Sequence, residues 1–229
     1  MVRRSKNDEI YIKIVYWGPA GGGKTTCLDT FAKLVTEESK EVIPQGDITK
    51  IAMSSGSTLY FDRGIFRHTQ QNKILFHVYT VAGQTRFSPL RKKIFDGTDG
   101  VIFVWDAQRA RLEDNLESLR ELKKISENKL IKFIPLLFML NKVDLNDTIS
   151  KEELEGILRE EGLISPNDQP LSLWNPIVYP TVSLYENQRN VYAVFSELAR
   201  RTALYQVYGD GEAPVQKGKI RLSKKVPDV

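Results

Sequence analysis

The sequence predicts an α/β fold with a doubly wound, mostly parallel six-stranded sheet and one antiparallel edge strand. Strand-like runs alternate with amphipathic segments along the chain, which is typical of parallel strands joined by crossover helices. The runs GVIFVWDA (100–107) and FIPLLFMLN (133–141) are almost wholly apolar, as in strands that are covered on both faces. The runs TLYFDRGIF (58–66) and KILFHVYTV (73–81) are separated only by RHTQQN, which predicts an antiparallel hairpin.

The remaining elements follow the same alternation. Leucines at helical spacing give the segment between the two apolar runs one apolar face. Ser150 and Glu153 form the capping-box pattern that begins a helix. The predicted order around the hairpin and the apolar runs is a strand at 10–17, a helix at 24–35, a long polar loop at 36–57, helices at 112–125 and 150–162, a strand at 175–183 and a helix at 191–198.

The composition predicts one cytoplasmic domain with tails. At 229 residues and 41% hydrophobic, the chain can bury a full core, and we expect a domain at 10–205 between a tail at 1–9 and a basic, flexible tail at 206–229. The single cysteine, Cys27, excludes an internal disulfide and suits a reducing compartment. The longest apolar run is too short to span a bilayer. The net charge of +4 is a small excess that does not indicate specific nucleic-acid binding.

Glycines cluster between the first predicted strand and the first predicted helix. WGPAGGGKTT (17–26) contains the pattern G-x-x-x-x-G-K-[ST] in the strand–loop–helix context that gives this pattern its meaning. Glycines leave the backbone N–H groups free to turn toward phosphate oxygens, while the lysine reaches the β and γ phosphates and the threonine hydroxyl binds Mg²⁺. The predicted phosphate-binding residues are Gly18, Gly21, Gly22, Gly23, Lys24, Thr25 and Thr26.

A second motif indicates which base is bound. NKVD (141–144) directly follows an apolar strand, at the edge where doubly wound sheets bind ligands. The carboxylate of Asp144 can accept hydrogen bonds from the N1–H and the exocyclic amine of guanine, and adenine lacks that pair of donors. Lys142 can lay its aliphatic stem along the base, and Asn141 can join this loop to the phosphate loop. The sequence therefore predicts a guanine nucleotide.

With these motifs in this order, the chain resembles the Ras-like small GTPases from about residue 10 to 204. In TVAGQTRF (80–87), Thr80 stands where most members have the aspartate of Asp-x-x-Gly-Gln. Together with KIVYWGPAGGGKTT, TLYFD and DGVIFVWDAQ, this substitution resembles the prokaryotic gliding-motility and polarity GTPases of the MglA type. The resemblance implies a molecular switch that binds GTP and GDP with Mg²⁺, hydrolyses GTP slowly, and signals through residues 36–58 and 80–97.

The resemblance also implies roles for single residues. Thr58 matches the switch threonine that senses Mg²⁺ and the γ-phosphate. Gly83 matches the glycine whose N–H contacts the γ-phosphate, and Gln84 matches the residue that orients the attacking water, while the lysine of the phosphate loop stabilises charge. Ser183 and Leu184 stand in the place of the last base-contacting loop, where the family usually has Ser-Ala-Lys.

Asp62 is an acid inside a predicted apolar strand. If the hairpin turns about Gln71, Asp62 lies opposite Thr80, which has a hydroxyl but no charge to offer Mg²⁺. One interpretation is that Asp62 supplies the carboxylate from the neighbouring strand. The alternative is an exposed acid on an edge strand, paired with Arg63 or Arg67.

Two other departures from the family pattern predict slow intrinsic hydrolysis. Ala20 replaces a glycine of the phosphate loop, and its side chain crowds an incoming arginine finger. Ser57 stands where the gliding-motility group tends to carry an arginine, for which Arg63 or Arg86 could substitute. Two alternatives to a switch therefore remain open, a GTP-binding scaffold with negligible turnover and a P-loop phosphotransferase that acts on a small molecule.

The resemblance implies partners for a monomeric domain. These are a GTPase-activating protein, possibly a small dimer of the roadblock type, and an effector that reads the two switch segments. The basic run of Arg86, Arg91, Lys92 and Lys93 is either a docking face for an acidic partner or a solvated helix face. The basic tail either makes weak contact with anionic lipid or serves as a disordered, solubilising segment.

Overall fold

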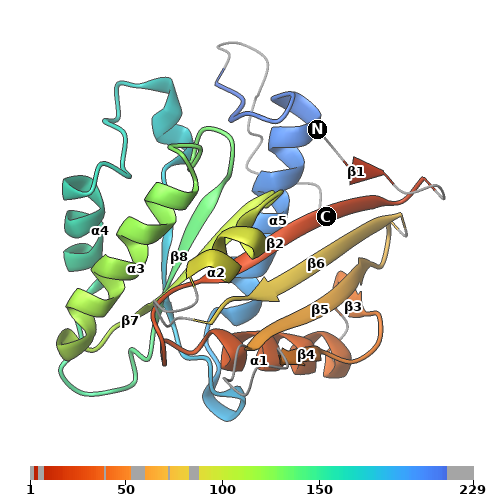
Figure 1. Cartoon of the computed structure of the whole chain (residues 1–229), viewed down its shortest axis with the longest axis horizontal. Helices are drawn as coiled ribbons and strands as arrows, with labels where there is room; N and C mark the ends of the chain where they lie inside the picture. Colours follow the sequence, from red (N-terminus) through yellow and green to blue (C-terminus); the bar gives the residue numbers. More distant parts are fainter. Residues whose placement is uncertain are drawn as a thin grey trace.

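The computed structural model describes residues 3–4, 8–38, 40–52, 60–71, 73–82 and 88–215. A single sheet has helices on both of its faces (Figure 1). Its strands are β1 (Arg3–Arg4), β2 (Ile10–Trp17), β3 (Val42–Pro44), β4 (Thr49–Ala52), β5 (Tyr60–His68), β6 (Ile74–Thr80), β7 (Gly100–Asp106), β8 (Leu136–Asn141) and β9 (Val178–Thr181).

Five helices accompany the strands in the described part of the chain. They are α1 (Lys24–Glu37), α2 (Ser88–Phe95), α3 (Leu112–Ile125), α4 (Lys151–Glu160) and α5 (Val191–Tyr208), with short 3-10 segments η2 (Arg109–Arg111), η3 (Pro170–Trp174) and η4 (Tyr185–Asn187). The predicted capping box is present, because the Ser150 side chain accepts a hydrogen bond from the Glu153 N–H and the Glu153 side chain accepts one from the Ser150 N–H.

The predicted fold class is confirmed. The strand order is β3-β5-β6-β2-β7-β8-β9, the run from β6 to β9 is parallel, and β5 is antiparallel to β6. The hairpin has the predicted register, since Arg63 pairs with Tyr79 and Gly64 with Val78. That register sets Asp62 beside Thr80.

The sheet has more strands than the predicted six. The segment 36–57, expected to be a loop, contributes β3 and β4, and both pair with the outer side of β5. β5 is therefore not the edge strand, because β3 and β4 form hydrogen bonds with backbone groups that an edge strand would leave unpaired. At the N-terminus, Arg3–Arg4 form β1 against β2.

Residues that follow position 205 also pack against the rest of the chain. Helix α5 continues to Tyr208, and the following residues pack against the domain. Ala213 is buried and donates its N–H to the Lys132 carbonyl at 2.7 Å, while Trp174 Nε1 donates to the Pro214 carbonyl at 3.3 Å. The rest of the predicted tail, 216–229, lies outside the described residues.

The side chains of β2 separate two cores because neighbouring residues on a strand point to opposite faces. Ile12, Ile14 and Tyr16 pack with residues of α1 and α5, whereas Val15 and Trp17 pack with residues of α3. Both faces of the central strands are thus buried, as their apolar sequences predict. Among the described residues, no helix has both the length and the hydropathy that crossing a membrane requires.

Candidate functional site

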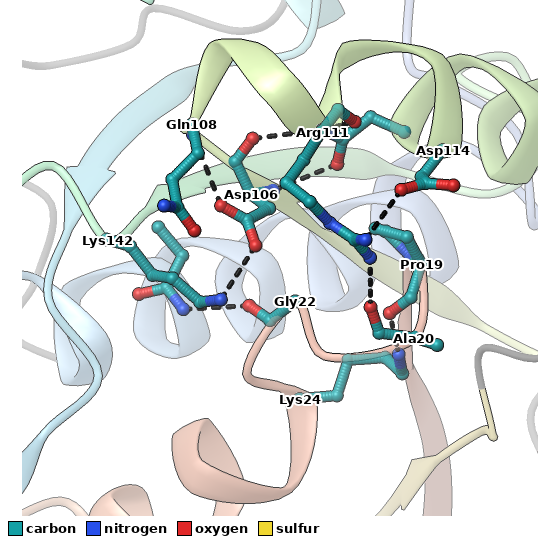
Figure 2. A network of polar contacts seen from close by, with 11 residues as sticks. Pro19, Ala20, Gly22, Lys24, Asp106, Gln108, Arg111, Asp114 and Lys142 are labelled. Carbon is teal, nitrogen blue, oxygen red and sulfur yellow. Dashed lines mark hydrogen bonds and ion pairs between the residues drawn. The ribbon is translucent and has the colours of Figure 1, made fainter. Parts of the chain in front are cut away.

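The candidate site lies at one edge of the sheet, where the carboxyl ends of neighbouring parallel strands meet. β2 ends at Trp17 and leads through the glycine-rich loop into α1, while β7 ends at Asp106 and β8 at Asn141. Figure 2 shows that residues of these three connections form one network of polar contacts. This is the position at which doubly wound sheets bind their ligands.

The phosphate loop follows a path that only glycine tolerates at its two ends. Gly18 has φ +144° and Gly23 has φ +101°, in the region that side chains rarely enter. A Cβ at Gly18 would overlap the Val104 carbonyl oxygen of β7, and a Cβ at Gly23 would overlap Nδ2 of Asn141. The loop is therefore wedged between β7 and the Asn-Lys-x-Asp segment.

The remaining predicted residues of the loop lie along the same path. A Cβ added at Gly22 would lie 3.3 Å from the Val104 carbonyl oxygen, whereas a Cβ added at Gly21 would have no atom within 4 Å. Thr25 and Thr26 begin helix α1 after Lys24. The loop thus presents bare backbone on one side and a helix N-terminus at its end, the arrangement that attracts anions.

Lys24 is buried behind this loop. Its Nζ donates hydrogen bonds to the Gly18 carbonyl at 3.0 Å and to the Pro19 carbonyl at 2.6 Å. Burial, and then the positive charge of Arg91, lower the pKa of Lys24 to about 7. A bound phosphate would add negative charge beside this amine, so the pKa of Lys24 would rise.

Asp62 faces the start of α1. It is 2% exposed, and its Oδ2 accepts hydrogen bonds from Thr25 Oγ1 at 2.7 Å and from Thr80 Oγ1 at 2.9 Å. The alternative of an exposed acid paired with an arginine is therefore wrong. Arg67 instead forms an ion pair with Glu9 at 3.1 Å.

The side chains of Asp62 and Thr25 fit a magnesium ion. Mg²⁺ binds one or two carboxylates together with substrate phosphates and waters, and the Thr25 hydroxyl can keep its hydrogen bond to Asp62 while a lone pair faces a metal. The described residues contain no group of three or more His, Cys, Asp or Glu side chains that could hold a metal by themselves. A metal here would depend on the hydroxyl and on the oxygens of a ligand.

Asn141 joins the base side of the site to the phosphate side. Its side chain is fully buried, and Nδ2 donates to the Gly22 carbonyl at 2.9 Å. Within the described part of the chain its Oδ1 is buried without a hydrogen-bond partner, which leaves an acceptor available at this point. Lys142 follows with φ +67°, and Asp144 is exposed.

The two weaker base candidates differ in burial. Ser183 is buried, its Oγ lies 3.2 Å from a Cβ added at Gly23, and its carbonyl accepts a hydrogen bond from Thr30. Leu184 is 55% exposed. Three other predicted residues, Thr58, Gly83 and Gln84, lie outside the described residues, as do Ser57 and Arg86.

Two arginines, Arg91 of the basic run and Arg63, do not lie where the sequence predicted. Arg91 is 1% exposed, forms an ion pair with Glu121 at 2.6 Å and lies 4.2 Å from the Trp17 ring centroid. Arg91 therefore lies neither on a docking face nor on a solvated helix face. Lys92 and Lys93 are exposed. Arg63 lies over the Tyr79 ring, because alternation along β5 turns it away from the face of its neighbour Asp62.

Two residues that the sequence analysis missed also contact the site. Arg111 donates to the Ala20 carbonyl at 2.7 Å and pairs with Asp114, as Figure 2 shows. The buried Asp106 accepts a hydrogen bond from Lys142 Nζ at 2.7 Å. An acid at the end of a wholly apolar strand was the available signal for Asp106, and nothing in the sequence marked Arg111.

The fold and this site define a Ras-like P-loop domain. A wedged glycine loop leads from strand to helix, and an Asn-Lys-x-Asp segment is hydrogen-bonded to it from a neighbouring parallel strand. The model of the ADP-ribosylation factor family matches residues 1–189. The chain belongs to this family of small GTPases.

Several characterised proteins are similar to it. The mutual gliding-motility protein MglA of Myxococcus xanthus (strain DK1622) is 35% identical over 166 residues, which cover 68% of this chain and 79% of MglA. The ADP-ribosylation factor-like protein 3 of Chlamydomonas reinhardtii is 28% identical over 171 residues, 74% of this chain and 82% of that protein. Human ADP-ribosylation factor-like protein 4A is 36% identical over 86 residues, 37% of this chain and 42% of its own length.

The wedged geometry predicts different costs for alanine at two glycines of the loop. Both Gly21 (φ +74°) and Gly23 (φ +101°) have positive φ, so each substitution should cost about 1–2 kcal/mol of backbone strain. Gly23→Ala must also displace Asn141, which should add roughly 1–3 kcal/mol. Urea unfolding of both variants measures the difference, and equal losses would contradict the wedge.

Proposed function

We propose that this protein is a nucleotide-dependent molecular switch that binds GTP and GDP with Mg²⁺ and hydrolyses GTP slowly. The observation that carries the proposal is the hydrogen bond from Asn141 to the Gly22 carbonyl at 2.9 Å. It holds the glycine-rich loop and the Asn-Lys-x-Asp segment against each other, which supports a site where one nucleotide would contact both. Family membership supports the same conclusion.

The base would be read by the Asn-Lys-x-Asp segment. Asp144 is exposed and offers two acceptor oxygens to the donor pair of guanine. A bound base would cover this carboxylate and remove water from it, so a wrong base would leave the acceptors unpaired at a cost of about 1–3 kcal/mol. Guanine is therefore favoured over adenine.

The phosphates and the metal would lie over the start of α1. Bound Mg²⁺ supplies positive charge to the β and γ phosphate oxygens. Thr25 would hold the metal through its hydroxyl, and Asp62 would provide the carboxylate that the family usually has at the position of Thr80. Thr58 would contact the metal from the first switch segment.

Hydrolysis would be an attack of water on the γ-phosphate. Gly83 would contact the γ-phosphate through its backbone, and Gln84 would orient the water. The ammonium of Lys24 would stabilise charge on the phosphate oxygens. Release of the γ-phosphate would free the segments 36–58 and 80–97, which is how such proteins signal.

We infer the setting from the relatives. The name of the Myxococcus xanthus protein refers to gliding motility, so we propose a role in cell polarity or motility for a cytoplasmic, monomeric domain. A GTPase-activating partner, possibly a roadblock-type dimer, would accelerate hydrolysis, and an effector would bind the two switch segments.

Two features favour a second candidate, a GTP-binding scaffold with negligible turnover. Ala20 occupies the place where an arginine finger approaches, and Arg63 points away from the site over Tyr79. Neither feature interferes with nucleotide binding, so binding and turnover must be measured separately.

The binding claim is tested by nucleotide competition. Purified protein stripped of nucleotide should bind GDP and GTP about 5- to 100-fold more tightly than ADP and ATP, as a loss of about 1–3 kcal/mol implies. Isothermal titration in the presence of Mg²⁺ gives the four dissociation constants. A preference for adenine nucleotides would overturn the proposal.

Asp62→Asn should weaken the Mg²⁺-dependent part of GTP binding by about 10–100-fold, as the loss of a group that orients a metal ligand commonly does. The substitution keeps the shape of the side chain but removes its charge. Affinity in excess EDTA should change little, and this comparison separates a metal effect from a folding defect. Equal losses with and without Mg²⁺ would contradict the role of Asp62.

Gln84→Ala should slow GTP hydrolysis by about one to three orders of magnitude in the presence of an activating partner. Affinity for GTP and GDP should remain near that of the wild type, because the amide is needed for the transition state and not for the bound state. Single-turnover hydrolysis of preloaded GTP measures the rate, and Gln71→Ala is the matched control at an exposed glutamine. Equal rates for the wild type and Gln84→Ala, with and without the partner, would favour the scaffold.

A further inference from the structure

Asp106 is a buried carboxylate that the proposed binding chemistry does not use. It ends β7 and is 1% exposed. Its Oδ2 accepts a hydrogen bond from Lys142 Nζ at 2.7 Å, and its Oδ1 accepts one from the Gln108 N–H at 3.2 Å. Figure 2 shows the Lys142 side chain reaching toward this carboxylate.

The backbone of Asp106 is fixed from two sides. The fully buried Asn115 of α3 accepts from the Asp106 N–H and donates to the Asp106 carbonyl, both at 2.9 Å. On the other side, Asp106 is paired with Asn141 in the parallel ladder of β7 and β8, and Ala107 donates its N–H to the Asn141 carbonyl at 2.9 Å. The carboxylate is thus held in one place relative to the start of the Asn-Lys-x-Asp segment.

The contact with Asp106 restricts the conformation of the Lys142 side chain. It has a backbone φ of +67°, an unfavourable region for a side chain of this size, and its side chain is only 29% exposed. A lysine has many rotamers, and fixing its ammonium at a buried carboxylate removes most of them before a ligand arrives. Ordering a binding residue in advance raises affinity, because the ligand no longer has to order it.

We propose that Asp106 is a positioning residue for base recognition, which holds the ammonium of Lys142 so that its aliphatic stem forms one fixed wall of the guanine site. The inference rests on the proposed function, since it assumes that this segment binds a base. It adds a residue that lies outside the Asn-Lys-x-Asp motif, on a different strand, and that acts only through Lys142.

The same connection between β7 and α3 also contacts the phosphate side. Asn115 Nδ2 donates to the Arg111 carbonyl at 2.7 Å, and the Arg111 guanidinium donates to the Ala20 carbonyl at 2.7 Å. Loss of the Asp106 carboxylate leaves these backbone contacts in place. Asp106→Asn should therefore disturb base binding without moving the phosphate loop.

A double-mutant cycle tests the inference. The variants are Asp106→Asn, Lys142→Met and the double variant, with Glu153→Gln as the control that removes a carboxylate from an exposed ion pair with Arg109. Stopped-flow release of a fluorescent GDP gives the dissociation rate. We expect each single variant to accelerate release by about tenfold, the double variant to release no faster than Lys142→Met, and the control to match the wild type.

A second readout separates positioning from a structural role. In Asp106→Asn, the rate of GDP release should change by a much larger factor than the rate of single-turnover hydrolysis of bound GTP, because the phosphate contacts are kept, whereas a structural defect would change both rates alike. If Asp106→Asn does not fold, Lys142→Arg serves instead, since its guanidinium can still pair with Asp106. Lys142→Arg should then release GDP several-fold more slowly than Lys142→Met.

Two results would overturn the inference while leaving the proposed function intact. The first is a double variant whose effect equals the product of the two single effects, and the second is Lys142→Arg releasing GDP as fast as Lys142→Met. A wild-type protein that binds no guanine nucleotide would overturn both the inference and the proposed function.

Discussion

The phosphate loop has no space for side chains where it touches the sheet, and this steric limit determines much of the site. Gly18 is pressed against the Val104 carbonyl oxygen and Gly23 against Asn141. The loop can take this path only while β7 and β8 lie beside β2 in the observed order. Asn141 therefore affects the loop in two ways. It leaves no space for a side chain at Gly23, and it donates a hydrogen bond to the Gly22 carbonyl.

The charge near α1 depends on strand register in the same way. Asp62 lies on β5, and it reaches Thr25 and Thr80 because the hairpin pairs Arg63 with Tyr79. A slip of one residue would turn the carboxylate to the opposite face of the sheet. Placing the acid on β5 instead of at position 80 keeps it within reach of the helix start, because neighbouring strands lie about 5 Å apart.

The sequence was informative where one short segment determines a structure. The alternation of strands and helices, the glycine loop and the hairpin register all follow from local patterns, and the register led to Asp62. Contacts between distant segments could not be predicted in this way. The basic run around Arg91 looks solvated until Trp17 and Glu121 are placed beside it, and β3 and β4 are stable as strands only because β5 offers them a partner.

The ends of β7 and β8 connect the two halves of the site through a closed chain of contacts. Arg111 holds the phosphate loop at Ala20, Asn115 joins Arg111 to Asp106, and Asp106 holds Lys142. Asn141 closes the chain by returning to Gly22. Cooperative polar networks of this kind resist the movement of any single member. Under the proposed function, the base and phosphate ends of the nucleotide would depend on different parts of this chain of contacts, because Asn115 holds the backbone of Asp106 whether or not its carboxylate holds Lys142.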